Sequence, residues 1–165
     1  MKKINIALVT ILLIAFTSCG NSGNSNKELN TLRTQSDLIF EKGEKINSPN
    51  FTGNAWLNNL IIPDSLNQNA VGSVTFEPGA RTSWHSHPAG QIILALHGVG
   101  YYQEKGKPIE IIRKGEVVKC PHNIPHWHGA SPDSEFIQVA ITGRENGPTV
   151  WYEPVTDEEY TSTNK

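Results

Sequence analysis

Glycine and proline interrupt this chain at short and regular intervals from residue 71 onward. The 165 residues include 14 Gly and 10 Pro, and runs such as 73–76 and 136–141 are too short for core helices. Turns are expected at Glu77-Pro78-Gly79, Pro88-Ala89-Gly90, Gly98, Gly106 and Gly115. Short strands separated by evenly spaced turns are typical of a β-sandwich or barrel. The sequence therefore predicts an all-β chain, and its length fits a single folded domain.

Two segments outside this region carry further structural signals. Residues 37–40 and 56–62 are expected to form strands, with a loop rich in Gly, Asn and Pro between them. Near the end, Thr156 and Glu159 have the Ser/Thr-x-x-Glu spacing of a capping box. We therefore expect a short C-terminal helix with Thr156 as its N-cap.

The first nineteen residues have the form of a secretion signal. Lys2 and Lys3 precede an apolar run at 4–16, which is shorter than the roughly 20 residues of a membrane-spanning helix. Residues 16–20, Phe-Thr-Ser-Cys-Gly, resemble a bacterial lipobox with Phe16 where Leu is usual. The resemblance implies cleavage before Cys19 and acylation of that residue. The alternative is an ordinary signal peptide that leaves Cys19 as a free thiol.

On this interpretation the chain has three parts. Residues 1–19 are the signal peptide, and 20–31 form a flexible tether because 21–26 contain only Asn, Ser and Gly. The folded domain then spans 32–165. We expect the protein to be secreted across the inner membrane and held by its N-terminal lipid in the periplasm or cell envelope.

Charge and cysteine content limit the classes of partner. Without Lys2 and Lys3, 12 basic residues stand against 16 acidic ones, which gives a formal charge of about −4. Nucleic acid is therefore not an expected partner. If Cys19 is acylated, Cys120 has no cysteine to pair with in the chain. Its strand-like context, Val-Val-Lys-Cys, favours a buried and inert thiol.

Histidine placement is the most informative chemical feature. Four of the six histidines form two i, i+2 pairs, His85 with His87 and His126 with His128. On a strand, residues i and i+2 face the same side. Both pairs can therefore point into one barrel interior if their strands are neighbours. Imidazole nitrogen is a ligand for most first-row divalent metal ions.

The residues around these pairs resemble the two motifs of the cupin family: Gly79-x5-His85-x-His87-x3-Gln91-x6-Gly98 and Gly115-x5-Pro121-x-Asn123-x2-His126. Gln91 stands where Glu is usual, Asn123 replaces a Gly, and Ala130 stands where Asn is common. The resemblance implies a single-domain jelly-roll β-barrel that holds a divalent metal ion on His85, His87, Gln91 and His126. The alternative is a cupin that has lost its metal, with Gln91 as a trace of that loss.

Three further stretches are similar to small bacterial cupins that include manganese-dependent hydroxynitrile lyases. They are residues 74–81, 126–130 and 154–160. The resemblance implies Mn(II) as the preferred metal, and it implies a catalytic base at His128. An imidazole that titrates near neutrality is suited to accept a proton from a hydroxyl group. The alternative role for His128 is to orient a metal ligand.

Gln91 predicts the kind of chemistry. Three imidazoles and one amide oxygen are all neutral, so a bound ion keeps its full +2 charge and stabilises a developing anion more strongly than a site with a carboxylate would. An amide oxygen is a hard ligand that is compatible with Mn(II), Fe(II), Co(II) or Ni(II), and Zn(II) is a further alternative.

Three functions are compatible with these features. The first is a metal-dependent lyase that acts on a small hydroxyl- or carbonyl-containing substrate, as hydroxynitrile lyases do. The second is an oxygen-using cupin dioxygenase, and the third is a non-catalytic protein that binds a small ligand or metal. A homodimer is expected by analogy with similar cupins alone.

Overall fold

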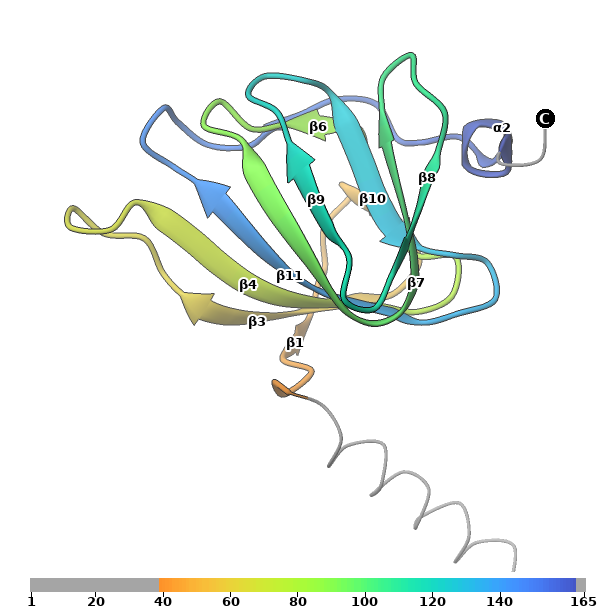
Figure 1. Ribbon diagram of the computed structural model, residues 1–165, viewed down its shortest axis with the longest axis horizontal. Coiled ribbons are helices and arrows are strands. Elements are labelled where there is room, and N and C mark those ends of the chain that lie inside the picture. Colours follow the sequence, from red (N-terminus) through yellow and green to blue (C-terminus); the bar gives the residue numbers. More distant parts are fainter. Residues whose placement is uncertain (1–38, 163–165) are drawn as a thin grey trace, which may run out of the picture. The chain divides into compact units, whose positions relative to one another are not determined.

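The structure is a computed structural model that describes residues 39–162, and these residues form twelve β-strands and one short helix (Figure 1). In chain order the elements are β1 (Glu44–Lys45), β2 (Phe51–Thr52), β3 (Ala55–Ile61), β4 (Asn69–Phe76), β5 (Arg81–Thr82), β6 (His85–Ser86), β7 (Gln91–Glu104), β8 (Glu110–Arg113), β9 (Val117–Cys120), β10 (His126–Ala130), β11 (Phe136–Gly143), β12 (Val150–Trp151) and α2 (Asp157–Tyr160). The prediction of an all-β fold with a short C-terminal helix is confirmed.

The longest strand, β7, belongs to both sheets of the fold. Its first half, residues 91–98, pairs with β11 on one side and with β9 on the other. Its second half, residues 99–104, pairs with β10 and β8. The first sheet continues from β11 through β4 and β3 to β1, and the second continues from β10 to β5 and β6. Because β7 passes from one sheet into the other, the antiparallel strands curl into a jelly-roll β-barrel (Figure 1).

A glycine marks the place where β7 changes sheets. The register with β11 shifts between Ile137 and Gln138, which pair with His97 and Ala95, so Leu96 is the extra residue of a β-bulge two residues before Gly98. Gly98 has φ +73°, in the left-handed region, and a Cβ there would overlap the carbonyl oxygen of Glu135. A bulge of this kind bends a strand and increases its twist. Gly98 therefore allows one strand to serve both sheets.

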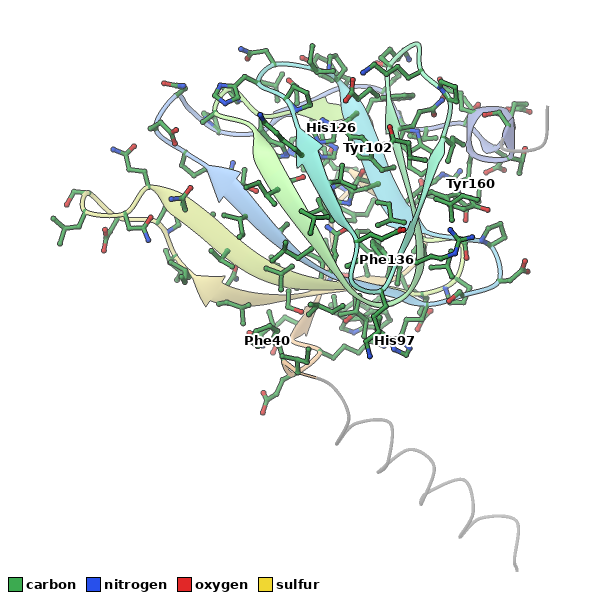
Figure 2. All side chains as sticks on the ribbon, viewed as in Figure 1. Phe40, His97, Tyr102, His126, Phe136 and Tyr160 are labelled. Carbon is green, nitrogen blue, oxygen red and sulfur yellow. The ribbon has the colours of Figure 1, made fainter. Side chains whose placement is uncertain are left out.

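Alternate residues of the long strands point into the barrel and form its core. Val74 and Phe76 of β4 pack with Ile93 and Ala95 of β7 and with Phe136 of β11. Phe76, Ile93 and Phe136 have no exposed surface. Burial of a Phe or Ile side chain stabilises the fold by about 1.5–3 kcal/mol. Figure 2 shows Phe136 and His126 at different ends of the barrel, and the apolar core reaches the histidines where Phe76 packs against His128.

A second apolar cluster lies under the C-terminal segment. Trp84 and Trp127 are 2% and 0% exposed, and they pack with Val155 and Tyr160. Both tryptophans therefore point away from the histidine side chains and into packing. The predicted capping box is also present, because the Thr156 hydroxyl accepts a hydrogen bond from the Glu159 N–H and the Glu159 side chain accepts one from the Thr156 N–H.

Arg81 fastens the C-terminal segment to the barrel. Its buried guanidinium forms a 2.6 Å ion pair with Asp157 and donates a 3.1 Å hydrogen bond to the Val155 carbonyl. The same guanidinium lies 4.5 Å from the ring centroid of Tyr160, whose hydroxyl donates to the Ala130 carbonyl at 2.8 Å. Helix α2 therefore covers the outer face of the sheet that carries β10.

Several predictions concern the ends of the chain. The signal peptide at 1–19, the acylated Cys19 and the tether at 20–31 lie outside the described residues, so they stay predictions. The strand expected at 56–62 is β3 with a one-residue shift. At 37–40, only Ile39 and Phe40 are described and they form bends, not a strand. No described helix is long and apolar enough to cross a membrane.

The left-handed glycine beside this bulge generates a stability prediction. We expect Gly98→Ala to lower the free energy of unfolding by at least about 3 kcal/mol, because it adds an overlap with a backbone carbonyl to the strain of a left-handed residue. Gly106→Ala is the matched control: Gly106 has φ +82° but no atom within 4 Å of an added Cβ, so the cost should be about 1–2 kcal/mol. Denaturant titration measures both, and equal losses would contradict the role given to Gly98.

Candidate metal centre

The pairing of β6 with β10 brings the two histidine pairs together. His85 of β6 is the register partner of His126 of β10. His87 follows β6 directly, and His128 lies two residues along β10 on the same face as His126. The ring centroid of His85 is 4.4 Å from that of His126, 5.0 Å from that of His87 and 5.2 Å from that of His128. The expectation that both pairs point into one interior is confirmed.

All four imidazoles are buried and are held in the neutral form. Burial lowers the pKa of each ring, and it does so most strongly for His85 and His128. For His87, burial first, then the nearby His126 imidazole and the Arg144 guanidinium, lower the pKa to about 3. A metal ligand must present an unprotonated nitrogen. At neutral pH these side chains meet that requirement without releasing a proton.

Backbone carbonyls fix the tautomers of two of the rings. Nδ1 of His85 is 2.9 Å from the Ser83 carbonyl oxygen, and Nδ1 of His126 is 2.9 Å from that of Ile124. A carbonyl oxygen only accepts hydrogen bonds, so each Nδ1 carries the proton. The lone pair is then on Nε2, as metal ligation requires. Nε2 of His126 is buried and has no hydrogen-bond partner in the described part of the chain.

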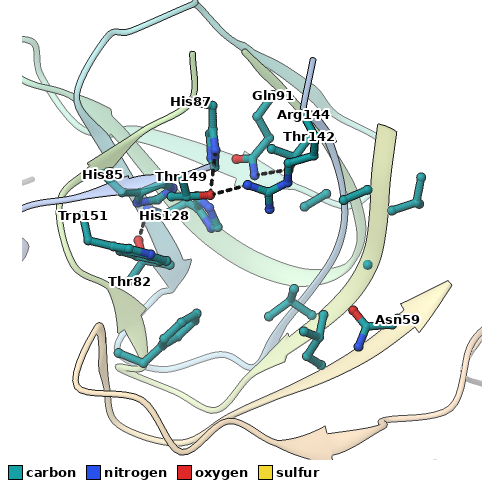
Figure 3. A pocket seen from close by; sticks show the side chains of 17 residues that line it. Asn59, Thr82, His85, His87, Gln91, His128, Thr142, Arg144, Thr149 and Trp151 are labelled. Carbon is teal, nitrogen blue, oxygen red and sulfur yellow. Dashed lines mark hydrogen bonds between the residues drawn. The ribbon is translucent and has the colours of Figure 1, made fainter. Parts of the chain in front are cut away.

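His87 and Gln91 are oriented by hydroxyl groups. Nδ1 of His87 lies 3.2 Å from Oγ1 of Thr149, and Nε2 of His87 is buried without a partner among residues 39–162. The amide nitrogen of Gln91 donates to Oγ1 of Thr142 at 2.9 Å. Its amide oxygen therefore faces the side of His87 (Figure 3). Two nitrogen lone pairs and one amide oxygen without strong partners fit a metal ion of the predicted class.

The structure also brings His128 into this group. One ligand atom each from His85, His126 and His128 lies within 4.8 Å of the others, so these three histidines form a cluster that could hold a metal ion. His87 is close as well, with its ring centroid 5.4 Å from that of His126. The predicted ligand set of His85, His87, Gln91 and His126 therefore stays a prediction, and His128 is adjacent to it.

A cavity of about 160 Å³ opens beside the histidines (Figure 3). One part of its wall is polar and includes His85, His87, Gln91 and His128. The remainder is largely apolar, with contributions from Phe51, Leu57, Val71, Val74, Ala140 and Trp151. His126 is fully buried and does not line the cavity. The site can accept a small molecule with a polar group and a compact apolar body.

Sequence reasoning missed three residues of this cavity. Arg144 and Thr149 lie in the connection between β11 and β12, and Trp151 is in β12. Trp151 is the register partner of His85, and its ring centroid is 4.9 Å from that imidazole. No spacing in the sequence indicates this contact, because it depends on β12 returning to pair with the two-residue strand β6. Thr142, which accepts the hydrogen bond from the Gln91 amide, also lines the cavity.

The other sequence-predicted residues lie elsewhere. His97 and His122, the two histidines outside the i, i+2 pairs, are exposed, and Figure 2 shows His97 far from His126. Cys120 is buried and free among the described residues, and burial raises the pKa of its thiol to about 12. Its Sγ lies 3.8 Å from the Gln91 amide oxygen. The prediction of a buried, unreactive thiol fits these properties.

Comparisons with known proteins define the family. The family model described as Cupin domain matches residues 72–141, and the chain belongs to the cupin family. An (R)-mandelonitrile lyase from Granulicella tundricola is 43% identical over 111 residues, which cover 67% of this chain and 85% of that protein. The resemblance to small cupins of the hydroxynitrile lyase type is thereby confirmed.

Solved structures agree with this assignment. A cupin-like protein from Thermotoga maritima has a TM-score of 0.73 and 49% identity, and the match covers 75% of this chain and 95% of that one. The polyketide cyclase RemF from Streptomyces resistomycificus has a TM-score of 0.59 at 20% identity, with coverage of 76% and 87%. The second likeness extends to the fold alone.

The buried neutral histidines predict how stability depends on pH. Between pH 6.5 and the lower pKa values of the folded chain, the unfolded state binds more protons, so the free energy of unfolding falls as the pH falls. His87 alone, with a folded pKa of about 3, should cost about 2 kcal/mol between pH 7 and pH 5. Denaturant titration of the metal-free chain measures this loss. A free energy of unfolding that stays constant or rises over that interval would contradict it.

Proposed function

We propose that this cupin is a metal-dependent lyase that acts on a small hydroxyl- or carbonyl-containing substrate. The observation that carries the proposal is a buried set of uncharged ligand atoms beside a small cavity. The similarity to an (R)-mandelonitrile lyase supports the reaction class, and cleavage of a cyanohydrin to an aldehyde and cyanide is the most concrete form of it.

In this proposal Nε2 of His85, His87 and His126 and the amide oxygen of Gln91 hold the metal. A divalent ion, with Mn(II) favoured by the resemblance, would supply electrostatic stabilisation of the anion that develops as the bond breaks. The hydrogen bonds to Ser83 and Ile124 keep two of the rings in the tautomer that this requires. In this proposal the two hydrogen bonds therefore keep both rings in the ligating tautomer in the metal-free chain as well.

His128 is proposed as the base that takes the hydroxyl proton. Its ring lines the cavity, whereas the ring of His126 does not. The edge of the ring packs against Phe76, with the centroids 5.8 Å apart and the planes at 89°. Nδ1 of His128 has no partner in the described part of the chain, and burial keeps the ring unprotonated. The lowered pKa departs from the near-neutral titration expected from the sequence: the imidazole is free to accept a proton from a bound hydroxyl at neutral pH, but burial makes it a weaker base.

A pair of variants tests the proposal. We expect His126→Ala to lose both the bound metal and the release of cyanide from mandelonitrile, because a ligand is removed. His128→Asn should keep the metal content of the wild-type chain and lose activity by about 100-fold or more, because only proton transfer is removed. Elemental analysis and cyanide detection measure the two properties.

Three outcomes would contradict the proposal. Equal metal content in the wild-type chain and His126→Ala would exclude the assigned site. Metal loss in His128→Asn would make His128 a ligand and not the base. A metal-loaded wild-type chain that releases no cyanide or aldehyde would remove cyanohydrin cleavage, and oxygen uptake or tight ligand retention would then favour the dioxygenase or the non-catalytic function.

We also propose that the domain is attached to a membrane by a lipid on Cys19 and acts as a homodimer in the periplasm or cell envelope. The lipobox-like residues 16–20 support the first part, and analogy with similar cupins supports the second. Mass spectrometry of the mature N-terminus and sedimentation of the purified chain address them separately.

A further inference from the structure

The cavity beside the histidines contains one charged residue. Among the 17 side chains that line it, Arg144 carries a full charge and the others are apolar, imidazole, amide or hydroxyl groups (Figure 3). No aspartate or glutamate is in this lining. Arg144 therefore makes the field inside the cavity positive. A bound divalent ion with neutral ligands would add to it.

Arg144 has hydrogen-bonding capacity that the described residues do not use. Its Nη1 donates to Oγ1 of Thr149 at 2.9 Å, and this is its one side-chain hydrogen bond within residues 39–162. A guanidinium has five N–H donors. The other buried arginine, Arg81, forms an ion pair with Asp157, whereas no described carboxylate pairs with Arg144. Partial burial of a cation that lacks an acidic partner costs free energy of folding unless a ligand supplies an anionic group.

The backbone holds the Arg144 side chain at the histidine end of the barrel. Arg144 follows β11, where Thr142 is the register partner of Gln91. The Arg144 N–H donates to the Gln68 carbonyl at 2.9 Å, and its own carbonyl accepts from the Gly147 N–H. The Arg144 guanidinium projects into the cavity between the hydroxyl of Thr149 and the amide of Gln91 (Figure 3). The two backbone hydrogen bonds therefore fix the position of Arg144 at this end of the barrel.

The cavity wall opposite Arg144 indicates which substituent a bound anionic molecule would carry. Phe51, Leu57 and Val74 line the apolar side, and Trp151 closes it next to His85. A planar guanidinium matches a carboxylate through two parallel hydrogen bonds. The small volume and the apolar wall fit a compact hydrocarbon group better than a phosphate with its hydration shell.

We propose that Arg144 binds a carboxylate of the substrate, so that the natural substrate is a small hydroxy or oxo carboxylic acid with a compact apolar or aromatic group. The identity of the reacting hydroxyl or carbonyl rests on the proposed function, but binding of the carboxylate does not. Arg144 is a specificity-determining residue of the cavity, and mandelonitrile tests the reaction class without using this contact.

Calorimetric binding to the metal-loaded full chain tests this with two probes of one shape. Mandelate carries the carboxylate, and mandelamide replaces it with a neutral amide. We expect the wild-type chain to bind mandelate at least 10-fold more tightly than mandelamide. Arg144→Gln should weaken mandelate binding by about 10- to 100-fold and change mandelamide binding by less than threefold. Arg144→Lys should restore part of the loss.

Two controls distinguish carboxylate binding by Arg144 from a general charge effect and from a role in metal binding. Arg113→Gln removes a positive charge from an exposed position on β8 and should leave mandelate binding unchanged. The metal content of Arg144→Gln should equal that of the wild-type chain, because Arg144 is hydrogen-bonded to Thr149 and not to His87, and loss of its charge removes no ligand atom.

Distinct results would overturn the inference. Unchanged mandelate affinity in Arg144→Gln would show that the carboxylate is bound elsewhere. A parallel loss of mandelamide binding and of metal would make Arg144 a positioning residue for His87, and inorganic phosphate binding as tight as mandelate would exclude carboxylate selectivity. Failure of the lyase proposal is distinguishable, because it abolishes cyanide release and leaves the binding measurements intact.

Discussion

The rest of the site depends on the register between β6 and β10. This pairing sets His85 opposite His126, and each ring then donates from Nδ1 to a carbonyl two residues before it. Burying polar rings is costly unless their hydrogen-bonding groups are satisfied. Here one nitrogen of each ring is satisfied by the backbone and the other is left for a ligand. The apolar core stabilises the fold and so compensates for the burial of this polar cluster.

The sequence predicts much of this arrangement because the period of a strand is two residues. His85 with His87 and His126 with His128 could be assigned to shared faces, and the spacing of the two motifs indicated the barrel. The capping box at Thr156 was equally readable, since it depends on local contacts alone. The sequence does not reveal how far apart two remote segments lie in the folded chain. Sharing a face with His126 does not reveal that His128 lies as close to the cluster as a ligand would.

Arg144 shows the limit of sequence reasoning most clearly. It stands in a connection with no periodic pattern, and its role depends on two tertiary contacts, the return of β12 to β6 and the bond to Thr149. Arg144 makes the cavity positive, and no acidic residue lines its wall. The uncharged ligand atoms of the proposed site would leave the charge of a bound metal uncompensated, so in our proposal the cavity receives an anion, either as a leaving group or as part of the substrate.

Anomalous diffraction from crystals of the manganese-loaded chain tests the proposed metal site without relying on turnover, because it locates the ion itself. We expect one anomalous peak within bonding distance of Nε2 of His85, His87 and His126 and of the amide oxygen of Gln91, with the His128 ring outside that distance. A peak bound by His85, His126 and His128 that leaves His87 and Gln91 unliganded would contradict it. So would fully loaded crystals with no peak at this end of the barrel.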